Sequence, residues 1–193
     1  MAEPSGGNDE DWAGHPGPRL AVRPMTGDEV QRMVGYFHDA DDEFLALLGA
    51  DRSRFPDRTT WCDLARDDMA RPLPEREYHY LIWEVDDRAV GHCNINKIAF
   101  GRDAYLHLHL WEQPERGRGL GTRLLAESVA IFCRLFELEA VYSEPHALNP
   151  APNKTMERVG FRLERTYETT PGWINVRQQV NRWRFHCGTA TTA

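Results

Sequence analysis

The chain has 193 residues, a formal net charge of −7 and a hydrophobic fraction of 41%, which together indicate one globular domain with a substantial core. The acidic balance and the lack of a basic block argue against a nucleic-acid surface. No apolar run approaches ~20 residues, and the N-terminus lacks a charged start before an apolar core. We therefore expect no membrane span, no signal peptide and a cytoplasmic protein.

The first part of the chain predicts a tail, a strand and helices. Residues 1–18 are rich in Gly, Pro, Asp and Glu with almost nothing to bury, which predicts a disordered tail. Thr26 followed by Glu29 has the pattern of a capping box and marks a helix start. The predicted elements are a strand at 20–22, a helix from Thr26 to about His38, and two short helices on either side of a loop at 51–56.

From residue 78 the apolar period changes from helical to alternating, which indicates strands. Asp86 and Asp87 predict a tight turn between the first two, and Gly160 predicts the end of a helix. The predicted strands are 78–85, 89–98, a third from the turn at 100–103 to Leu110, 140–144, 161–167 and 176–185, and the helices are 121–136 and 149–159. Because residues 187–193 have little to bury, the predicted domain is 19–186.

The cysteines lie far apart, without a Cys-x-x-Cys pair. We expect reduced, mostly buried thiols and neither a metal site nor a disulfide framework. The four residues are Cys62, Cys93, Cys133 and Cys187.

A glycine-rich stretch separates the strand that ends at Leu110 from the next helix. Glycine lets a ligand approach the backbone closely, and the first N–H groups of a helix have no partner within it. This pattern predicts an anion site, most naturally for a pyrophosphate, with arginines around it. The residues concerned are Gly117, Gly119 and Gly121 with Arg116, Arg118 and Arg123.

The stretch does not match two familiar phosphate loops. A P-loop needs Lys and then Ser or Thr after its last glycine, where this chain has Thr122 and Arg123, and the dinucleotide fingerprint needs a third glycine at Thr122. The pattern Arg-x-x-Gly-x-Gly, at Arg116, Gly119 and Gly121, resembles the acyl-CoA loop of the GNAT acyltransferase superfamily. The predicted order of elements also resembles the GNAT order over nearly the whole chain. The alternative is a strand-to-helix turn without a ligand.

A second motif follows the strand at 140–144. Glu144-Pro145, Asn149 and the run from Glu157 to Phe161 resemble a stretch of several GNAT branches, in which the Asn contacts the pantetheine arm. Asn149 to Phe161 also resembles the ribosomal-protein N-acetyltransferase branch, although Pro152 stands where that branch usually has Ser.

The resemblance implies an α/β (α+β) fold with a central mixed seven-stranded sheet, splayed between strands four and five and flanked by helices. It implies acetyl-CoA as co-substrate, with its pantetheine arm pairing to the fourth strand like an added strand. The residues it assigns to acetyl-CoA are Leu110, Trp111, Arg116, Gly117, Arg118, Gly119, Leu120, Gly121, Thr122, Asn149 and Asn153.

An acceptor amine must lose a proton before it attacks, so a base is needed. His107 and His109 share one face of their strand with Trp111, opposite the leucines, and Glu144 ends the fifth strand. His107 resembles the catalytic His of siderophore-type lysine N-acyltransferases, and Glu144 resembles the acid of aminoglycoside 6′-N-acetyltransferases. We favour Glu144; the alternative is hydrogen-bonded sheet histidines and a surface carboxylate. A zinc site would need Glu112, which alternation places on the other face, so we expect no metal.

These features predict an acyl-CoA-dependent N-acyltransferase for the primary amine of a small molecule, and the resemblance leaves room for a homodimer. The alternatives are an acetyltransferase for protein N-termini and a catalytically silent CoA-binding module. Many GNAT enzymes have a Tyr four residues before the Gly of the Gly-Phe pair, where it protonates the leaving thiolate; this chain has Met156. We expect the thiolate to leave unaided or to take its proton from another group, such as Tyr142.

Overall fold

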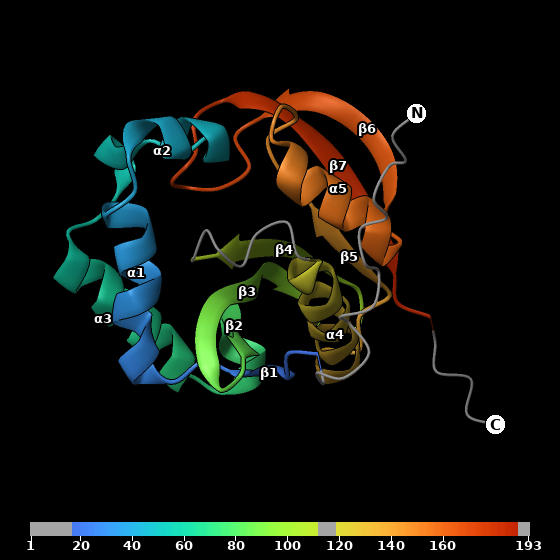
Figure 1. The fold of residues 1–193 in the computed structure, drawn as a ribbon, viewed down its shortest axis with the longest axis horizontal. Helices are drawn as coiled ribbons and strands as arrows, with labels where there is room; N and C mark the ends of the chain where they lie inside the picture. The colour runs from blue at the N-terminus through green and yellow to red at the C-terminus, as the bar shows by residue number, and fades with distance from the viewer. Residues whose placement is uncertain (1–16, 112–118, 189–193) are drawn as a thin grey trace, which may run out of the picture.

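A computed structural model describes residues 17–111 and 119–188. Its seven strands form one mixed sheet in the order β1-β2-β3-β4-β5-β7-β6, flanked by helices (Figure 1). The strands are β1 (Leu20–Pro24), β2 (Tyr78–Val85), β3 (Arg88–Ala99), β4 (Asp103–Leu110), β5 (Ala140–Ser143), β6 (Arg162–Thr169) and β7 (Gln178–His186). The helices are α1 (Val30–His38), α2 (Asp42–Leu48), α3 (Arg58–Ala70), α4 (Leu120–Leu135) and α5 (Pro150–Val159), with 3-10 turns at Gly27–Glu29, Arg52–Arg54 and Leu73–Glu75. The predicted fold class is confirmed.

Local sequence signals determine several element ends as predicted. The capping box of Thr26 and Glu29 is present, and the Thr26 N–H donates to Glu29 Oε2 at 2.9 Å. Asp86 and Asp87 have φ values of 49° and 62°, as the two-residue turn of a tight hairpin requires. Gly160 ends α5 with φ 100°.

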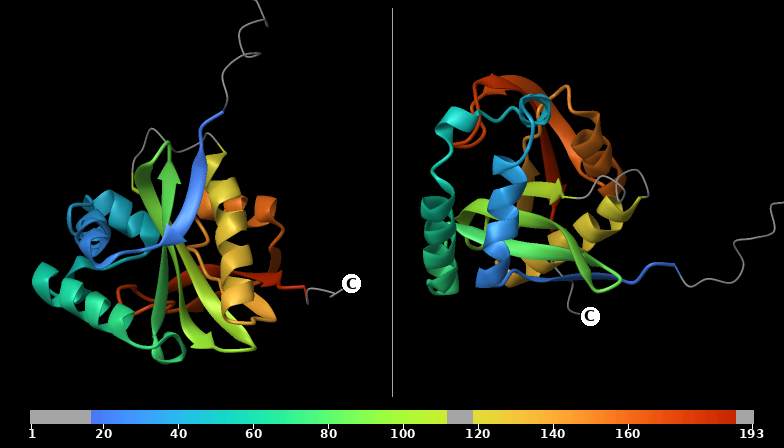
Figure 2. Two further views of the ribbon diagram at one scale, coloured as in Figure 1. Left: turned by 90° about the horizontal axis from the view of Figure 1, so that it is seen from below. Right: turned by 60° about the vertical axis from the view of Figure 1, so that its left-hand side comes forward.

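Helices cover the sheet on both faces, as Figure 2 shows. On β2, Leu81 and Trp83 belong to the core that includes α4, whereas Tyr80 and Ile82 belong to the core formed with α1 and α3. Burial on both faces explains why β2 is apolar almost throughout rather than alternating.

The sheet opens between its two central strands. β4 and β5 are parallel and pair only from Asp103 to Tyr105 on β4. One residue further along β4, the Ser143 hydroxyl of β5 donates to the Leu106 carbonyl at 2.9 Å. In the part of the chain that the structure describes, no hydrogen bond joins β4 to β5 beyond Leu106. The predicted splay between strands four and five is confirmed.

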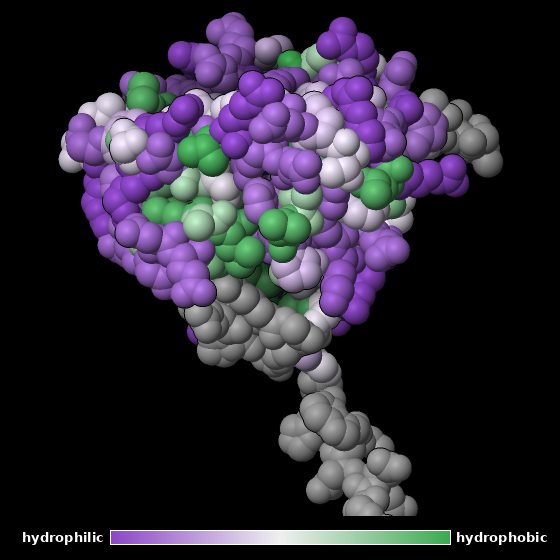
Figure 3. Space-filling model, turned by 90° about the horizontal axis from the view of Figure 1, so that it is seen from above, coloured by the Kyte–Doolittle hydropathy of each residue, from purple (hydrophilic) through white to green (hydrophobic). Residues whose placement is uncertain are grey.

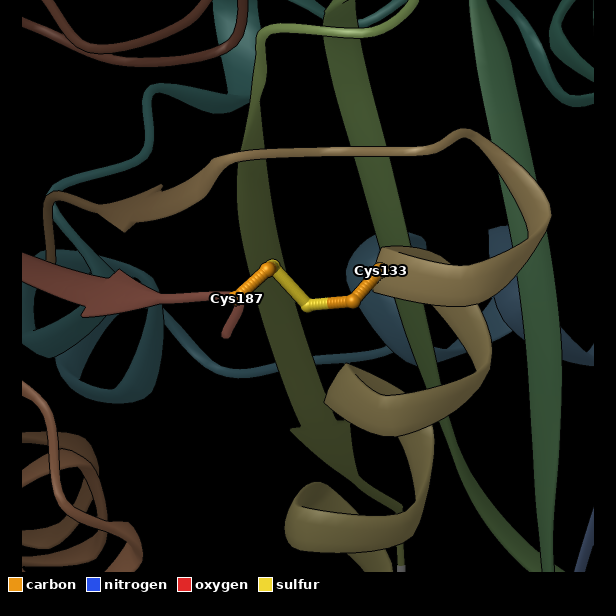
Figure 4. The surroundings of a disulfide bond; sticks show 2 residues. All are labelled: Cys133 and Cys187. Carbon is orange, nitrogen blue, oxygen red and sulfur yellow. A yellow bond between two sulfur atoms is a disulfide. The ribbon is translucent and has the colours of Figure 1, made fainter. Parts of the chain in front are cut away.

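A disulfide joins Cys133, in the last turn of α4, to Cys187, directly after β7 (Figure 4). The prediction of four reduced thiols is therefore wrong for this pair, and only Cys62 and Cys93 are free. Cys133 and Cys187 are 54 residues apart in the sequence, and only the folded sheet brings the end of β7 beside α4. Cys187, one residue beyond the predicted boundary at 186, is 5% exposed. Disulfides persist in oxidising compartments. The cysteines of this chain are therefore not evidence for a reducing compartment.

No helix in residues 17–111 and 119–188 is long and apolar enough to cross a membrane.

Candidate active site

The glycine turn before α4 has an open front. Gly119 is the N-cap of α4 with φ 76°, and a Cβ built on it would meet no atom of the described residues within 4 Å. Among the described residues, a Cβ on Gly121 would meet only Leu110 Cδ1, at an ordinary 3.6 Å. Packing against the described residues therefore does not require these two glycines, although Gly119 needs its left-handed conformation. Space remains for a ligand at the N–H groups of the helix start.

A cavity of about 300 Å³, which we name the glycine-turn cavity, lies in front of this turn between α2 and α5. Figure 3, seen from the side of α2 and α5, shows apolar residues gathered in a hollow of this face. Lys154 and Arg158, one turn apart on α5, also border the cavity, and our sequence analysis missed them. Of the predicted acetyl-CoA residues, those that border it are Leu110, Gly119, Gly121, Thr122 and Asn149.

The other predicted acetyl-CoA residues have different surroundings. Leu120 is buried in the core. The Trp111 backbone N–H donates to the Val90 carbonyl, and its indole N–H donates to His92 Nδ1 at 2.8 Å. Both N–H groups of Trp111 are thus engaged within the protein. Arg116, Gly117, Arg118 and the alternative zinc ligand Glu112 lie outside the described residues.

Two asparagines hold α5 in place. Asn149 Oδ1 accepts from the Ala151 N–H at 3.3 Å and caps the helix. Asn153 Nδ2 donates to the Asn149 carbonyl at 2.7 Å, and its Oδ1 accepts from Trp183 Nε1 at 2.8 Å. The Asn153 amide therefore ties α5 to β7, which gives it a structural role.

A second cavity, of about 380 Å³, lies on the α1 and α3 side of β4, and we name it the aromatic cavity after its rings. All three predicted catalytic residues, His107, His109 and Glu144, border it. His109 also borders the glycine-turn cavity, whereas His107 and Glu144 do not. His109 is therefore one of the residues that border both cavities, together with Leu48, Leu108, Asn149 and Pro152.

The histidines form a cluster across β3 and β4. The strand register places His92 opposite His109, and their rings stack with centroids 4.7 Å apart. Because His92 Nδ1 accepts from Trp111, the neutral ring carries its proton on Nε2. His107 Nε2 lies 3.2 Å from Asn96 Oδ1. His92 was missed by the sequence analysis, since only the register between strands reveals it.

Burial keeps this cluster neutral. It lowers the pKa of His107 to about 4 and that of His92 to about 3. The pKa of His109 lies well below its usual range, first because of burial and then because of the neighbouring His92. The lowered pKa values favour the neutral form of all three rings, which is the form that can accept a proton.

Glu144 is buried beside a cation and a phenol. Its side chain is 5% exposed, its Oε1 accepts from the Tyr167 hydroxyl at 2.5 Å, and Arg182 Nη1 lies 3.5 Å away. Burial and this hydrogen bond raise the pKa of Tyr167. Arg182 also lies over the ring of Tyr142, at 4.3 Å from its centroid. The carboxylate is thus a partnered group in the cavity wall.

Met156 is fully buried in the core that includes α4, and it borders neither cavity. Its thioether cannot supply a proton to a leaving group.

A family model described as an acetyltransferase (GNAT) domain matches residues 19–162. The chain belongs to the GNAT acetyltransferase family. Among solved structures, this GNAT protein resembles the spermidine N-acetyltransferase of Vibrio cholerae in complex with CoA and spermine. The two share 15% identity and a TM-score of 0.69, over 86% of this chain and 95% of that chain.

Two other structures are similar. One is the ribosomal L7/L12 α-N-protein acetyltransferase RimL in complex with CoA, with 14% identity and a TM-score of 0.69 over 86% of this chain and 93% of that chain. The other is a putative acetyltransferase of Salmonella typhimurium with acetyl-CoA, with 13% identity and a TM-score of 0.67 over 90% and 96%. At these identities the likeness shows the GNAT fold. A search of curated proteins found no match.

Proposed function

We propose that this GNAT protein transfers the acetyl group of acetyl-CoA to the primary amine of a small molecule. The observation that carries the proposal is that His109, one of the predicted catalytic residues, borders both cavities. The glycine-turn cavity would hold the cofactor, with the pyrophosphate at the N–H groups that follow Gly119 and the phosphates near Lys154 and Arg158. The aromatic cavity would hold the amine.

The chemistry follows from the neutral imidazole. When bound, acetyl-CoA supplies the acetyl group as a thioester. The amine nitrogen bonds to the acetyl carbon, the carbon–sulfur bond breaks, and the proton lost by the amine passes to His109. Met156 supplies no acid to the departing thiolate, and a thiol with a pKa of about 8.5 is acidic enough to leave without one.

Two loops that close one side of the aromatic cavity, which we call its roof, favour a small acceptor over a protein. The loop after α2 is joined to the loop before β7 by backbone hydrogen bonds, from Asp51 N–H to the Ile174 carbonyl at 2.8 Å and from Val176 N–H to the Gly49 carbonyl at 3.1 Å. This connection restricts the room for a protein N-terminus. The ribosomal-protein alternative has only the motif resemblance and the names of some structural neighbours in its favour. The siderophore-type and aminoglycoside branches, the silent module and the homodimer stay predictions.

An assay of CoA thiol release with a panel of primary amines tests the proposal. His109→Gln should lower kcat/KM for the amine by about 100-fold, within the range for a positioned base, and leave acetyl-CoA affinity intact. His107→Gln and Glu144→Gln should cause smaller losses. A wild-type rate in His109→Gln would remove His109 as the base. Tight CoA binding without turnover on any amine would favour the silent module, and turnover on peptides alone would favour the N-terminal acetyltransferase.

A further inference from the structure

A continuous series of rings leads from the rim of the aromatic cavity to His109. Trp173, 45% exposed at the rim, contacts Trp61 edge to face with centroids 5.0 Å apart. Trp61 stacks on Phe37 at 5.3 Å, and Phe37 contacts the His109 ring at 5.0 Å. The route from the rim to the His109 imidazole is therefore lined by aromatic faces and edges.

The outermost ring is fixed in position. Trp173 Nε1 donates to the Tyr78 hydroxyl at 3.1 Å. The turn that carries Trp173 is closed by a hydrogen bond from the Asn175 N–H to the Gly172 carbonyl at 3.1 Å, and Asn175 pairs with Ala50 after α2. Because both the ring and its loop are held, Trp173 presents a preorganised apolar surface at the rim.

The carboxylates of the cavity already have partners. Asp68 accepts from the backbone N–H groups of Glu77 and Tyr78 at 2.8 and 2.9 Å, and it lies 3.6 Å from Arg71. The Glu77 side chain is 75% exposed and lies 3.8 Å from Arg71.

The third carboxylate, Glu144, is bound by Tyr167 and Arg182. Within the described residues, the two buried carboxylates of the aromatic cavity, Asp68 and Glu144, are therefore already partnered, and Glu77 is a solvent-exposed group beside Arg71. Burying a charge without a partner is costly.

We infer that the acceptor is a monoamine whose amino group is carried by an aromatic or similarly flat apolar body. This inference rests on the proposed function. Such a body gains ring contacts along the Trp173, Trp61 and Phe37 wall. A single ammonium group can lie against aromatic faces until its proton is removed. A polyamine would bring charges that this cavity does not balance, even though a structural neighbour is a spermidine N-acetyltransferase.

The test compares three amines at saturating acetyl-CoA, with the acetylated product measured by mass spectrometry. We expect kcat/KM for 2-phenylethylamine to exceed those for n-butylamine and spermidine by at least about tenfold. Trp173→Ala should lower the 2-phenylethylamine value by about tenfold, while the n-butylamine value and the KM for acetyl-CoA change by less than about twofold. Trp173→Phe should keep most of the ring preference. Leu163→Ala, at an exposed β6 residue that borders neither cavity, is the matched control.

A preference for spermidine, or an equal effect of Trp173→Ala on 2-phenylethylamine and n-butylamine, would overturn the inference and leave the proposed function standing. Acetylation of none of the amines, with CoA bound, would overturn both.

Discussion

The Cys133–Cys187 disulfide should contribute a large part of the stability of the fold. It closes a loop of 54 residues, which includes β5, α5, β6 and β7. In the chain-entropy model, a loop of this length loses about 14 cal/mol/K in the unfolded state, or about 4 kcal/mol at 25 °C. For a domain of this size, ~4 kcal/mol corresponds to a fall in Tm of about 8 to 16 °C. We expect Cys133→Ala and Cys187→Ala each to lower Tm by an amount in this range.

Calorimetry with and without a thiol reductant checks the prediction. The reductant should lower the Tm of the wild-type protein and leave the two variants unchanged, because they have no bond to lose. The double variant should match the single variants, apart from the small packing loss at the second site. Two results together would contradict the prediction. The wild-type Tm would be the same with and without reductant, and Cys133 and Cys187 would react with a thiol reagent after unfolding without reductant.

Three further predictions follow from the site and its supports. Gly121→Glu should weaken CoA binding by at least about 100-fold in calorimetry, because it places a carboxylate where phosphate would approach, whereas Ala126→Glu, an exposed position on the same helix, should bind normally. The pKa of His92 is about 3 in the folded protein and about 6.5 unfolded, so the unfolded state takes up the proton first as pH falls. Chemical denaturation should show ~2 kcal/mol of stability lost from this group between pH 7 and pH 5, with a shallower pH slope in His92→Gln; an unchanged slope would contradict the assignment. Gly49→Ala should destabilise the fold more than Gly101→Ala. Both glycines have positive φ, but only at Gly49 would the new Cβ lie 1.6 Å from a β7 side-chain oxygen. Equal losses of stability would show that the loop at Gly49 adjusts without cost.

Local sequence patterns predicted most of the helices, strands and turns. The features that they did not predict depend on which residues of distant strands lie opposite each other. The capping box at Thr26 and the turn at Asp86 depend on neighbouring residues, so the sequence revealed them. Alternation along one strand also placed His107 and His109 on the cavity face. The stacking partner His92 arrives on another strand, so periodicity within one strand could not find it.

The same limit explains two other differences from expectation. Glu144 was expected as an available carboxylate, but β6 and β7 later bring Tyr167 and Arg182 to it. The disulfide joins residues whose proximity depends on the finished sheet. Pairings between distant segments carry no local pattern, because they are set by topology.

The most direct test of acetyl transfer from acetyl-CoA to a primary amine uses acetyl-CoA with a ¹³C-labelled acetyl group. A panel of primary amines is incubated with it and the protein, and the products are measured by mass spectrometry. We expect labelled N-acetyl amine with the wild-type protein, a greatly reduced amount with His109→Gln, and none above background with Gly121→Glu. No labelled amine from a folded protein that binds CoA, or equal labelling by the wild type and both variants, would contradict it.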